Sequence, residues 1–266
     1  MSIGVNIFSL KNKTALITGA TGYLGREMAF GLAEAGAHVL VNSRSKKRCD
    51  VLVKELRDKG YSAEPVIFDV TSDQQVTLFA DAFKNRALHV MINNAYVGGA
   101  GSVKCASTTD YRDSYDVAVV AAHRLLQTLL PNLRLGVKDS GEASIINIAS
   151  MYALVSPDQR IYDSEQAVNP PFYGAAKAAL LQWTKYSACE FGKEGIRVNS
   201  IAPGPFPAEI VQSKSPSFIK KLEHKVPMGR IGQAKELKGP LLFLASSASS
   251  YVNGSNLTVD GGWTCW

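Results

Sequence analysis

Short apolar segments alternate with longer amphipathic ones along almost the whole chain. Several of the short segments are apolar at every position, as expected for strands buried on both faces of a parallel sheet. This alternation predicts an α/β fold, a doubly wound (Rossmann) sheet of seven mostly parallel strands with helices on both faces. The expected strands are Thr14–Thr18, His38–Val41, Pro65–Phe68, Leu88–Ile92, Ser144–Ala149, Ile196–Ile201 and Leu257–Val259.

The longer segments have the apolar spacing of helices. In the first, Leu24, Met28 and Leu32 recur four residues apart and define one apolar face. A chain of 266 residues could form one large domain or two small ones. No Pro/Ser-rich linker, long charge run or repeat interrupts the alternation, which favours one domain over residues 1–266. The other expected helices are Asp73–Asn85, Thr108–Leu130, Tyr173–Phe191 and Lys235–Ser246.

Two segments break the alternation and are expected to be irregular. Residues 151–171 are polar, contain three prolines and follow an expected strand, and residues 203–227 contain five prolines. Loops of this length are uncommon in a compact domain and often form lids or binding loops. We therefore expect both segments to border a binding site; the alternative is a surface insertion without a function.

A glycine-rich segment joins the first expected strand to the first helix. Glycine permits a tight turn and lets a phosphate approach the backbone, and a helix N-terminus offers free N–H groups and the positive end of its dipole. The segment therefore predicts a phosphate-binding turn, although a glycine turn that binds nothing is the alternative. Its candidate residues are Gly19, Thr21, Gly22, Tyr23, Leu24 and Gly25.

The second expected strand is followed by a basic residue. Sites selective for NAD usually place Asp or Glu here to bind the ribose 2′-hydroxyl, and this chain has neither. Arg44 can pair with a 2′-phosphate, helped by the Ser43 hydroxyl. These residues favour NADP(H) as the cofactor, and a solvated loop arginine is the alternative.

The next two strand ends also carry polar side chains. Asp69, followed by Val70, could contact the adenine amino group of a dinucleotide. Asn93, Asn94 and Ala95 end the fourth strand, at the carboxyl edge of the sheet where such a cofactor should lie. Polar residues at strand ends also cap turns, so a turn-capping role remains open for each.

Tyr173 and Lys177 are four residues apart in an expected helix, so their side chains share one face. A phenol is a poor base at neutral pH, but a neighbouring cation favours the phenolate and lowers its pKa. The pair is suited to moving a proton to or from an alcohol oxygen. Ser150 closes an apolar segment upstream. The pair alone also occurs by chance on exposed helix faces, and Ser150 alone could be structural.

In this order, these residues resemble the short-chain dehydrogenase/reductase family, in its single-domain branch. The resemblance spans nearly the whole chain and includes Pro203-Gly204 and the C-terminal Asp260-Gly261-Gly262. The Pro-rich and C-terminal segments look like those of bacterial gluconate 5-dehydrogenases and 3-oxoacyl reductases. The segment after Ser150 is similar to that of sugar-modifying members.

The resemblance implies a role for each candidate. Tyr173 would be the acid/base at the substrate oxygen, and Lys177 would lower the Tyr173 pKa and hold the nicotinamide ribose. Ser150 would hydrogen-bond the substrate oxygen and stabilise its developing charge. The nicotinamide would carry the hydride, with Pro203 and Gly204 among its contacts.

Four features depart from the family pattern. Tyr23 occupies a position that is usually glycine, so the glycine spacing resembles that of the sugar-nucleotide epimerase/dehydratase branch. Ala118 stands where a catalytic Asn usually positions a water in the proton path, and Ala208 where a Thr commonly contacts the nicotinamide carboxamide. The segment from Ser150 to Tyr173 is longer than usual by roughly ten residues, which indicates that 151–171 is an inserted active-site loop.

Charge and cysteine content exclude other classes. The net charge of +6 is mild and the basic residues are scattered, so we expect no nucleic-acid partner. No CxxC or HExxH pattern occurs, so we expect no metal, and four distant cysteines fit reduced thiols in a cytoplasmic protein. The N-terminus lacks the basic start of a signal peptide, and no apolar run approaches the roughly 20 residues that span a bilayer.

The leading hypothesis is an NADP(H)-dependent carbonyl reductase or alcohol dehydrogenase that acts on a small molecule. Polar residues of the 151–171 loop favour a carbohydrate-like substrate, and residues 203–227 would complete its binding region. A sugar-nucleotide-modifying enzyme and a non-catalytic NADP-binding regulator are the alternatives; the missing Asn at position 118 favours the regulator. Small and apolar residues of the Thr108–Leu130 and Tyr173–Phe191 helices, with the resemblance, imply a homodimer or homotetramer.

Overall fold

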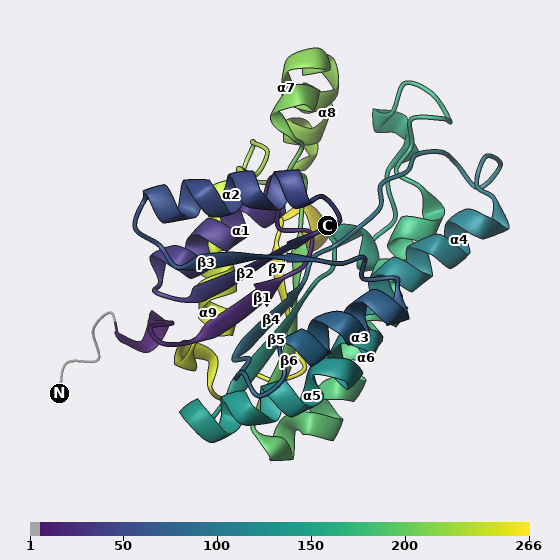
Figure 1. Ribbon diagram of the computed structural model, residues 1–266. Helices are drawn as coiled ribbons and strands as arrows, with labels where there is room; N and C mark the ends of the chain where they lie inside the picture. Colours follow the sequence, from purple (N-terminus) through teal and green to yellow (C-terminus); the bar gives the residue numbers. More distant parts are fainter. Residues whose placement is uncertain (1–5) are drawn as a thin grey trace.

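The computed structural model describes residues 6–266, which contain one sheet of seven parallel strands covered by helices on both faces (Figure 1). The strand order is β3-β2-β1-β4-β5-β6-β7. The predicted fold class is confirmed, and every strand pairing among the described residues is parallel. The strands are β1 Thr14–Ile17, β2 His38–Ser43, β3 Ala63–Ile67, β4 Val90–Asn93, β5 Ala143–Ile148, β6 Ile196–Pro203 and β7 Asn256–Val259.

Consecutive residues of the central strands pack into different hydrophobic cores, one on each face of the sheet. Ala15 and Ile17 of β1 pack under the helices α1 (Tyr23–Glu34), α2 (Lys46–Asp58) and α9 (Lys238–Ala245). Leu16 between them packs under α3 (Asp73–Ala82), α5 (Ala121–Ser140) and α6 (Pro171–Phe191). Side chains of a strand alternate between the two faces of the sheet, so a strand covered on both faces must be apolar throughout. This explains why the apolar segments of the sequence located the strands.

The helices follow the strands, and serine side chains cap several of them. Ser45, Ser72 and Ser107 accept backbone N–H groups in the first turns of α2, α3 and α4. The helices are α1 Tyr23–Glu34, α2 Lys46–Asp58, α3 Asp73–Ala82, α4 Thr108–Tyr115, α5 Ala121–Ser140, α6 Pro171–Phe191, α7 Glu209–Lys214, α8 Pro216–Lys225 and α9 Lys238–Ala245.

The helix expected over Thr108–Leu130 is longer and less uniform than predicted. A π turn, Asp116–Val120, separates α4 from α5, and α5 continues through Pro131 to Ser140. A proline inside a helix costs about 3 kcal/mol. Leu125, Leu129 and Leu133 are buried against the sheet, and each contributes roughly 1.5–3 kcal/mol. Burial on both sides of the proline therefore outweighs its cost.

The prediction that residues 203–227 are irregular was wrong over much of the segment. α7 and α8 both lie inside it, and α8 begins at Pro216. Proline is tolerated in the first turn of a helix because its missing N–H has no intrahelical partner there. Residues 151–171 are irregular up to the start of α6, apart from two 3₁₀ turns at Met151–Ala153 and Gln159–Ile161.

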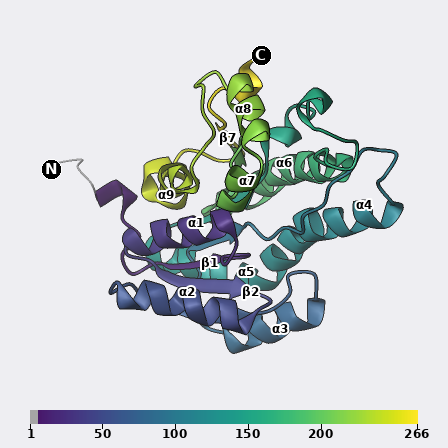
Figure 2. The ribbon, with the colours of Figure 1, turned by 90° about the horizontal axis from the view of Figure 1, so that it is seen from above.

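The 151–171 loop, α8 and the C-terminal residues form a small third core. Tyr152 and Ile161 of the loop pack with Leu222 of α8 and with Trp263, and Figure 2 shows α8 beside the C-terminus. In the described part of the chain no helix is long and apolar enough to cross a membrane. Residues 1–5, where the signal-peptide prediction starts, lie outside the described residues.

Candidate active site

The turn between β1 and α1 needs its glycines. Gly19 has a φ of +62°, and a Cβ built on it would lie 2.9 Å from the Cα of Ala95. A Cβ on Gly25 would collide with the carbonyl oxygen of Gly19. The first constraint comes from the close approach of this turn to the segment after β4, and the second from the way the turn folds against the first turn of α1. Glycine at both positions places no side chain between the backbone and a phosphate, as a phosphate-binding turn requires.

Asn94 and Thr18 brace this turn. The Asn94 Nδ2 donates to the carbonyl oxygens of Thr18, at 2.9 Å, and Gly19, at 3.1 Å. The Thr18 hydroxyl oxygen accepts the backbone N–H groups of Asn94 and Ala95 at 2.9 and 3.0 Å. The structure thus gives Asn94 the turn-bracing role that the sequence left open, and its contact with a cofactor stays a prediction.

The N-terminus of α1 opens at the same turn. The helix starts at Tyr23 after Gly22, and no side chain caps its first turn. Its first N–H groups therefore have no intrahelical acceptor and can bind an anion together with the helix dipole. Tyr23 is half-buried at the first helical position.

Arg44 and Asp69 meet at the ends of β2 and β3. The Arg44 guanidinium is 65% exposed and lies 3.7 Å from the Asp69 carboxylate. Burial alone would raise the pKa of Asp69, but hydrogen bonds from Thr71 and the Arg44 charge hold it below its ordinary value. The Ser43 hydroxyl contacts the Ser45 backbone and the Cys49 sulfur, at 3.1–3.2 Å, and so holds the start of α2.

The structure brings Ser150, Tyr173 and Lys177 together where β5 ends against α6. The Lys177 Nζ is buried and donates to the carbonyl oxygen of Ile148 at 2.7 Å. Burial lowers the pKa of Lys177 to about 8. Burial raises the pKa of Tyr173, and the Ser150 hydroxyl offsets part of that rise. The expected lowering of the Tyr173 pKa by Lys177 is therefore not seen, because burial dominates both groups.

Tyr96 is a neighbour of this group that the sequence analysis missed. It follows Ala95 directly, and its ring meets that of Tyr173 edge to face at 4.7 Å between centroids. The Lys177 Nζ lies 5.3 Å from the centroid of the Tyr96 ring. The only signal in the sequence was an aromatic residue directly after the polar end of a strand.

Ala118 lies in the π turn beside Lys177. Ala118 and Lys177, together with Asn93, Ala122 and other residues, line a cavity of about 10 Å³. This is close to the smallest volume that can hold one water molecule. The Asn93 Nδ2 donates to the Asn147 Oδ1 at 2.8 Å. Its own Oδ1 is buried and has no hydrogen-bond partner in the described part of the chain. Ala118 thus adds no polar side chain where the family pattern places an asparagine.

Most polar side chains of the 151–171 loop face outward. Asp158 pairs with Lys225 of α8 and with Arg160, and its pKa is lowered by hydrogen bonds from these two groups. Asp163 pairs with Lys221 at 2.6 Å. Gln159, Glu165 and Gln166 are exposed. The loop is therefore fixed to α8 by ion pairs outside and by apolar packing inside.

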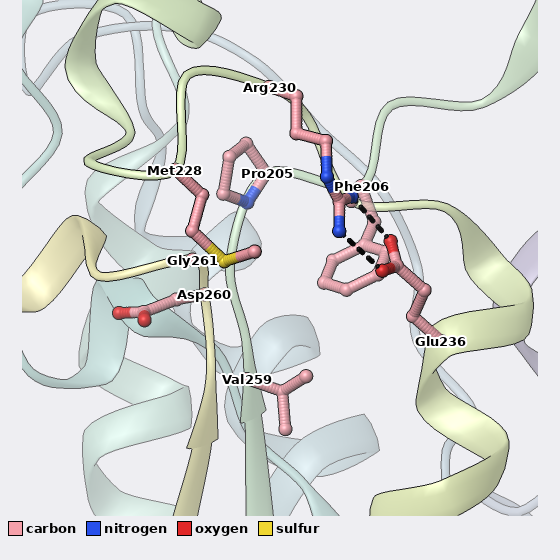
Figure 3. A pocket seen from close by; sticks show the side chains of 9 residues that line it. Pro205, Phe206, Met228, Arg230, Glu236, Val259, Asp260 and Gly261 are labelled. Atoms are coloured by element: carbon pink, nitrogen blue, oxygen red, sulfur yellow. Dashed lines mark hydrogen bonds and ion pairs between the residues drawn. The ribbon is translucent and has the colours of Figure 1, made fainter.

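A pocket of about 110 Å³ lies beyond the Pro203-Gly204 turn at the ends of β6 and β7 (Figure 3). A Cβ on Gly204 would lie 2.5 Å from the Cα of Asp260, so glycine lets the two strands' ends approach. Arg230 donates to both carboxylate oxygens of Glu236, at 2.8 and 2.7 Å, on the pocket wall. The rest of the lining is mainly apolar, from Pro205, Phe206, Met228 and Val259.

Comparison with known proteins shows the family of the chain. A family model described as Enoyl-(Acyl carrier protein) reductase matches residues 19–264. The chain belongs to the short-chain dehydrogenase/reductase family and is an oxidoreductase enzyme.

Its relatives act on chemically different alcohols. Gluconate 5-dehydrogenase of Gluconobacter oxydans (strain 621H) is 32% identical over 264 residues, which cover 97% of each chain. The 7alpha-hydroxysteroid dehydrogenase of Escherichia coli (strain K12) is 31% identical, covering 95% of this chain and 94% of that protein. The crystal structure of a gluconate 5-dehydrogenase from Burkholderia cenocepacia J2315, in complex with NADP and tartrate, superposes with a TM-score of 0.86 at 31% identity and 98% coverage of both chains.

Proposed function

We propose that this chain is an NADP(H)-dependent enzyme that interconverts a secondary alcohol and a carbonyl, with Ser150, Tyr173 and Lys177 as its catalytic residues. The observation that carries the proposal is the juxtaposition of these three side chains where β5 ends against α6. They lie at the carboxyl edge of the sheet, the usual place for ligands in such a fold.

The residues around the turn fit a dinucleotide phosphate. Gly19 and Gly25 leave the backbone open, and the uncapped start of α1 supplies N–H groups. Arg44 is largely exposed at the end of β2, where no acid stands, and so can pair with a 2′-phosphate. The Burkholderia structure, described with NADP, supports this choice.

The protein's own groups would move the proton. Bound NADP(H) would supply or accept the hydride. Because its pKa is raised, Tyr173 is protonated at neutral pH and suited to donate to the oxygen of a carbonyl under reduction. The Lys177 charge would stabilise the phenolate left behind, and the Ser150 hydroxyl would donate to the substrate oxygen. The site therefore favours carbonyl reduction at neutral pH.

We infer that the substrate is polar and carbohydrate-like. The gluconate relatives support this class. The polar side chains of the 151–171 loop do not add to it as the sequence predicted, because most of them face outward or pair with α8. Asn169 also supports a polar substrate. It lies four residues before Tyr173, and its buried Oδ1 has no hydrogen-bond partner among residues 6–266. The steroid relative defines the competing class, which apolar walls would favour.

The proposal is tested by NADPH oxidation with keto-sugars, keto sugar acids, steroid ketones and 3-oxoacyl esters. Turnover of the polar ketones should exceed that of the others. Tyr173→Phe removes only a hydroxyl, so turnover should fall at least about a hundredfold while NADPH still binds. Tyr186→Phe, on the exposed side of the same helix, is the control and should remain active. Activity retained by Tyr173→Phe would exclude Tyr173 as the acid/base.

A further inference from the structure

Tyr96 touches both members of the proposed catalytic pair but has no part in the proposed reaction. Its ring meets the Tyr173 ring edge to face, with the planes at 66° and the centroids 4.7 Å apart. This is the arrangement that aromatic pairs prefer, because the positive edge of one ring faces the negative face of the other. Tyr96 is half-buried beside α4 and packs on the apolar core that includes Val117.

The Lys177 ammonium lies among aromatic rings. Its Nζ is 5.3 Å from the centroid of Tyr96 and 5.8 Å from that of Tyr173, both within the range of cation–π attraction. An ammonium has three N–H donors, and the hydrogen bond that Nζ makes to the described residues is the one to Ile148. The rings therefore supply part of the stabilisation that water would give an exposed lysine.

The Tyr96 hydroxyl contributes little to these contacts. It is buried and has no partner with hydrogen-bond geometry in residues 6–266. The neighbouring Ser114 hydroxyl donates instead to the carbonyl oxygen of Phe172 at 3.2 Å. The contacts with Tyr173 and Lys177 both belong to the ring.

We propose that Tyr96 is a positioning residue whose ring holds the Tyr173 phenol against Lys177 and stabilises the Lys177 charge, without need of the Tyr96 hydroxyl. The proposal rests on the proposed function, because it assumes that Tyr173 and Lys177 are the catalytic pair. On this proposal, the segment directly after β4 helps to position the groups that transfer the proton.

Removal of the ring should change the pH dependence of carbonyl reduction. Without the aromatic face the Lys177 ammonium is less stable, so its pKa falls below the present value of about 8. The other titratable groups around the Lys177 ammonium are phenols, namely Tyr173 on α6 and Tyr152 after β5. The Tyr152 hydroxyl is hydrogen-bonded to the Tyr162 hydroxyl at 3.1 Å. The decline of the reduction rate at high pH should therefore move down by about half a pH unit.

The experiment compares Tyr96→Leu, which removes the ring, with Tyr96→Phe, which keeps it. The kcat for reduction is measured against pH with saturating NADPH and ketone. Tyr96→Leu should shift the profile down by about half a unit and lower kcat several-fold, and Tyr96→Phe should follow the wild type. Tyr251→Leu, at a fully exposed tyrosine, is the matched control. If Tyr96→Leu does not fold, Tyr96→Met keeps comparable bulk without an aromatic face.

Two outcomes overturn the proposal. An unshifted profile in Tyr96→Leu or Tyr96→Met would show that the ring does not stabilise Lys177. An equal shift in Tyr96→Phe would assign the effect to the hydroxyl. Tyr173→Phe separates these from failure of the proposed function: if that variant stays active, the catalytic pair itself is wrong. If it is inactive while Tyr96→Leu behaves as wild type, only the role of Tyr96 is wrong.

Discussion

At the scale of single residues, burial sets the pH range of the site. Burial lowers the pKa of Lys177 to about 8 and raises that of Tyr173 above its ordinary value. Tyr173 thus keeps its proton through neutral pH, while Lys177 carries its charge below about pH 8 and loses it above. Carbonyl reduction needs both the proton and the charge, whereas alcohol oxidation needs the Tyr173 phenolate.

We therefore predict opposite pH profiles for the two directions. The reduction rate should be flat at neutral pH and fall above about pH 8 as Lys177 loses its charge. The oxidation rate should rise with pH through the neutral range, because the phenolate fraction increases about tenfold per pH unit below the pKa. Initial rates with NADPH and ketone, and with NADP and alcohol, measure both. A reduction rate that increases above pH 8 would contradict the low Lys177 pKa.

Arg44 carries the second prediction at this scale. Arg44→Ala should weaken NADP(H) binding about ten- to a hundredfold, the scale of one charged hydrogen-bonded pair, and leave NAD(H) binding nearly unchanged. Fluorescence titration of both cofactors measures this. Lys46→Ala is a suitable control, because Lys46 is an exposed base in the same segment that pairs with Asp50 at 2.7 Å. Equal affinity of the wild-type protein for NADP(H) and NAD(H) would contradict the predicted preference for NADP(H).

The sequence was sufficient to predict the reacting groups, but not the burial and the neighbours that set their pKa values. The four-residue spacing of Tyr173 and Lys177 and the strand end at Ser150 predicted which side chains meet. The direction of the Tyr173 pKa shift could not be predicted, because it depends on burial by side chains far away in the sequence. Tyr96 was missed for the same reason: its contacts with α6 exist only after β4 and β5 pair.

At the scale of elements, patterns that reflect burial were more predictive than prolines, which located the irregular 151–171 loop but not the helices of residues 203–227. The strands were located because most of them are largely apolar on both faces; the polar residues of β3 and β6 are exceptions. Pro131 and Pro216 misled the prediction, since the first is compensated by leucine burial in α5 and the second occupies a tolerated first turn. The π turn at Asp116–Val120 leaves no mark in a single sequence, because it differs from an α turn only in its backbone hydrogen bonds.

The π turn gives the prediction that belongs to this scale. Ala118 borders a cavity of only about 10 Å³ beside Lys177, so Ala118→Asn would overpack it. We expect the variant to lose about 1–3 kcal/mol of stability and to gain no more than a few-fold in turnover. Chemical denaturation and steady-state kinetics measure the two effects. Ala178→Asn, at an exposed position of α6, serves as the control for substitution in a helix. A gain of a hundredfold or more would show that the site lacks a relay that asparagine restores.

At the scale of the whole molecule, two neighbouring helices carry exposed aromatic residues. α4 and α6 pack side by side (Figures 1 and 2). Tyr111 and Tyr115 of α4 and Tyr186 of α6 are 41%, 48% and 69% exposed. Exposed aromatic groups of this density are typical of surfaces that bind another protein. The small residues Ala118 and Ala122 pack with Ala176 and Ala179, which brings the π turn and the start of α5 close to α6.

We predict that this side is the contact between two copies of the chain. A twofold interface uses the same surface on both copies, so one substitution acts twice. Tyr186→Glu would place a charge in this contact on both copies and should break it while each copy stays folded, so that a dimer gives monomers and a tetramer gives dimers. Light scattering at micromolar concentration measures the mass, and circular dichroism the fold. Tyr251→Glu, at a fully exposed tyrosine outside α4 and α6, should leave the mass unchanged. A wild-type monomer at that concentration would contradict the predicted homodimer or homotetramer.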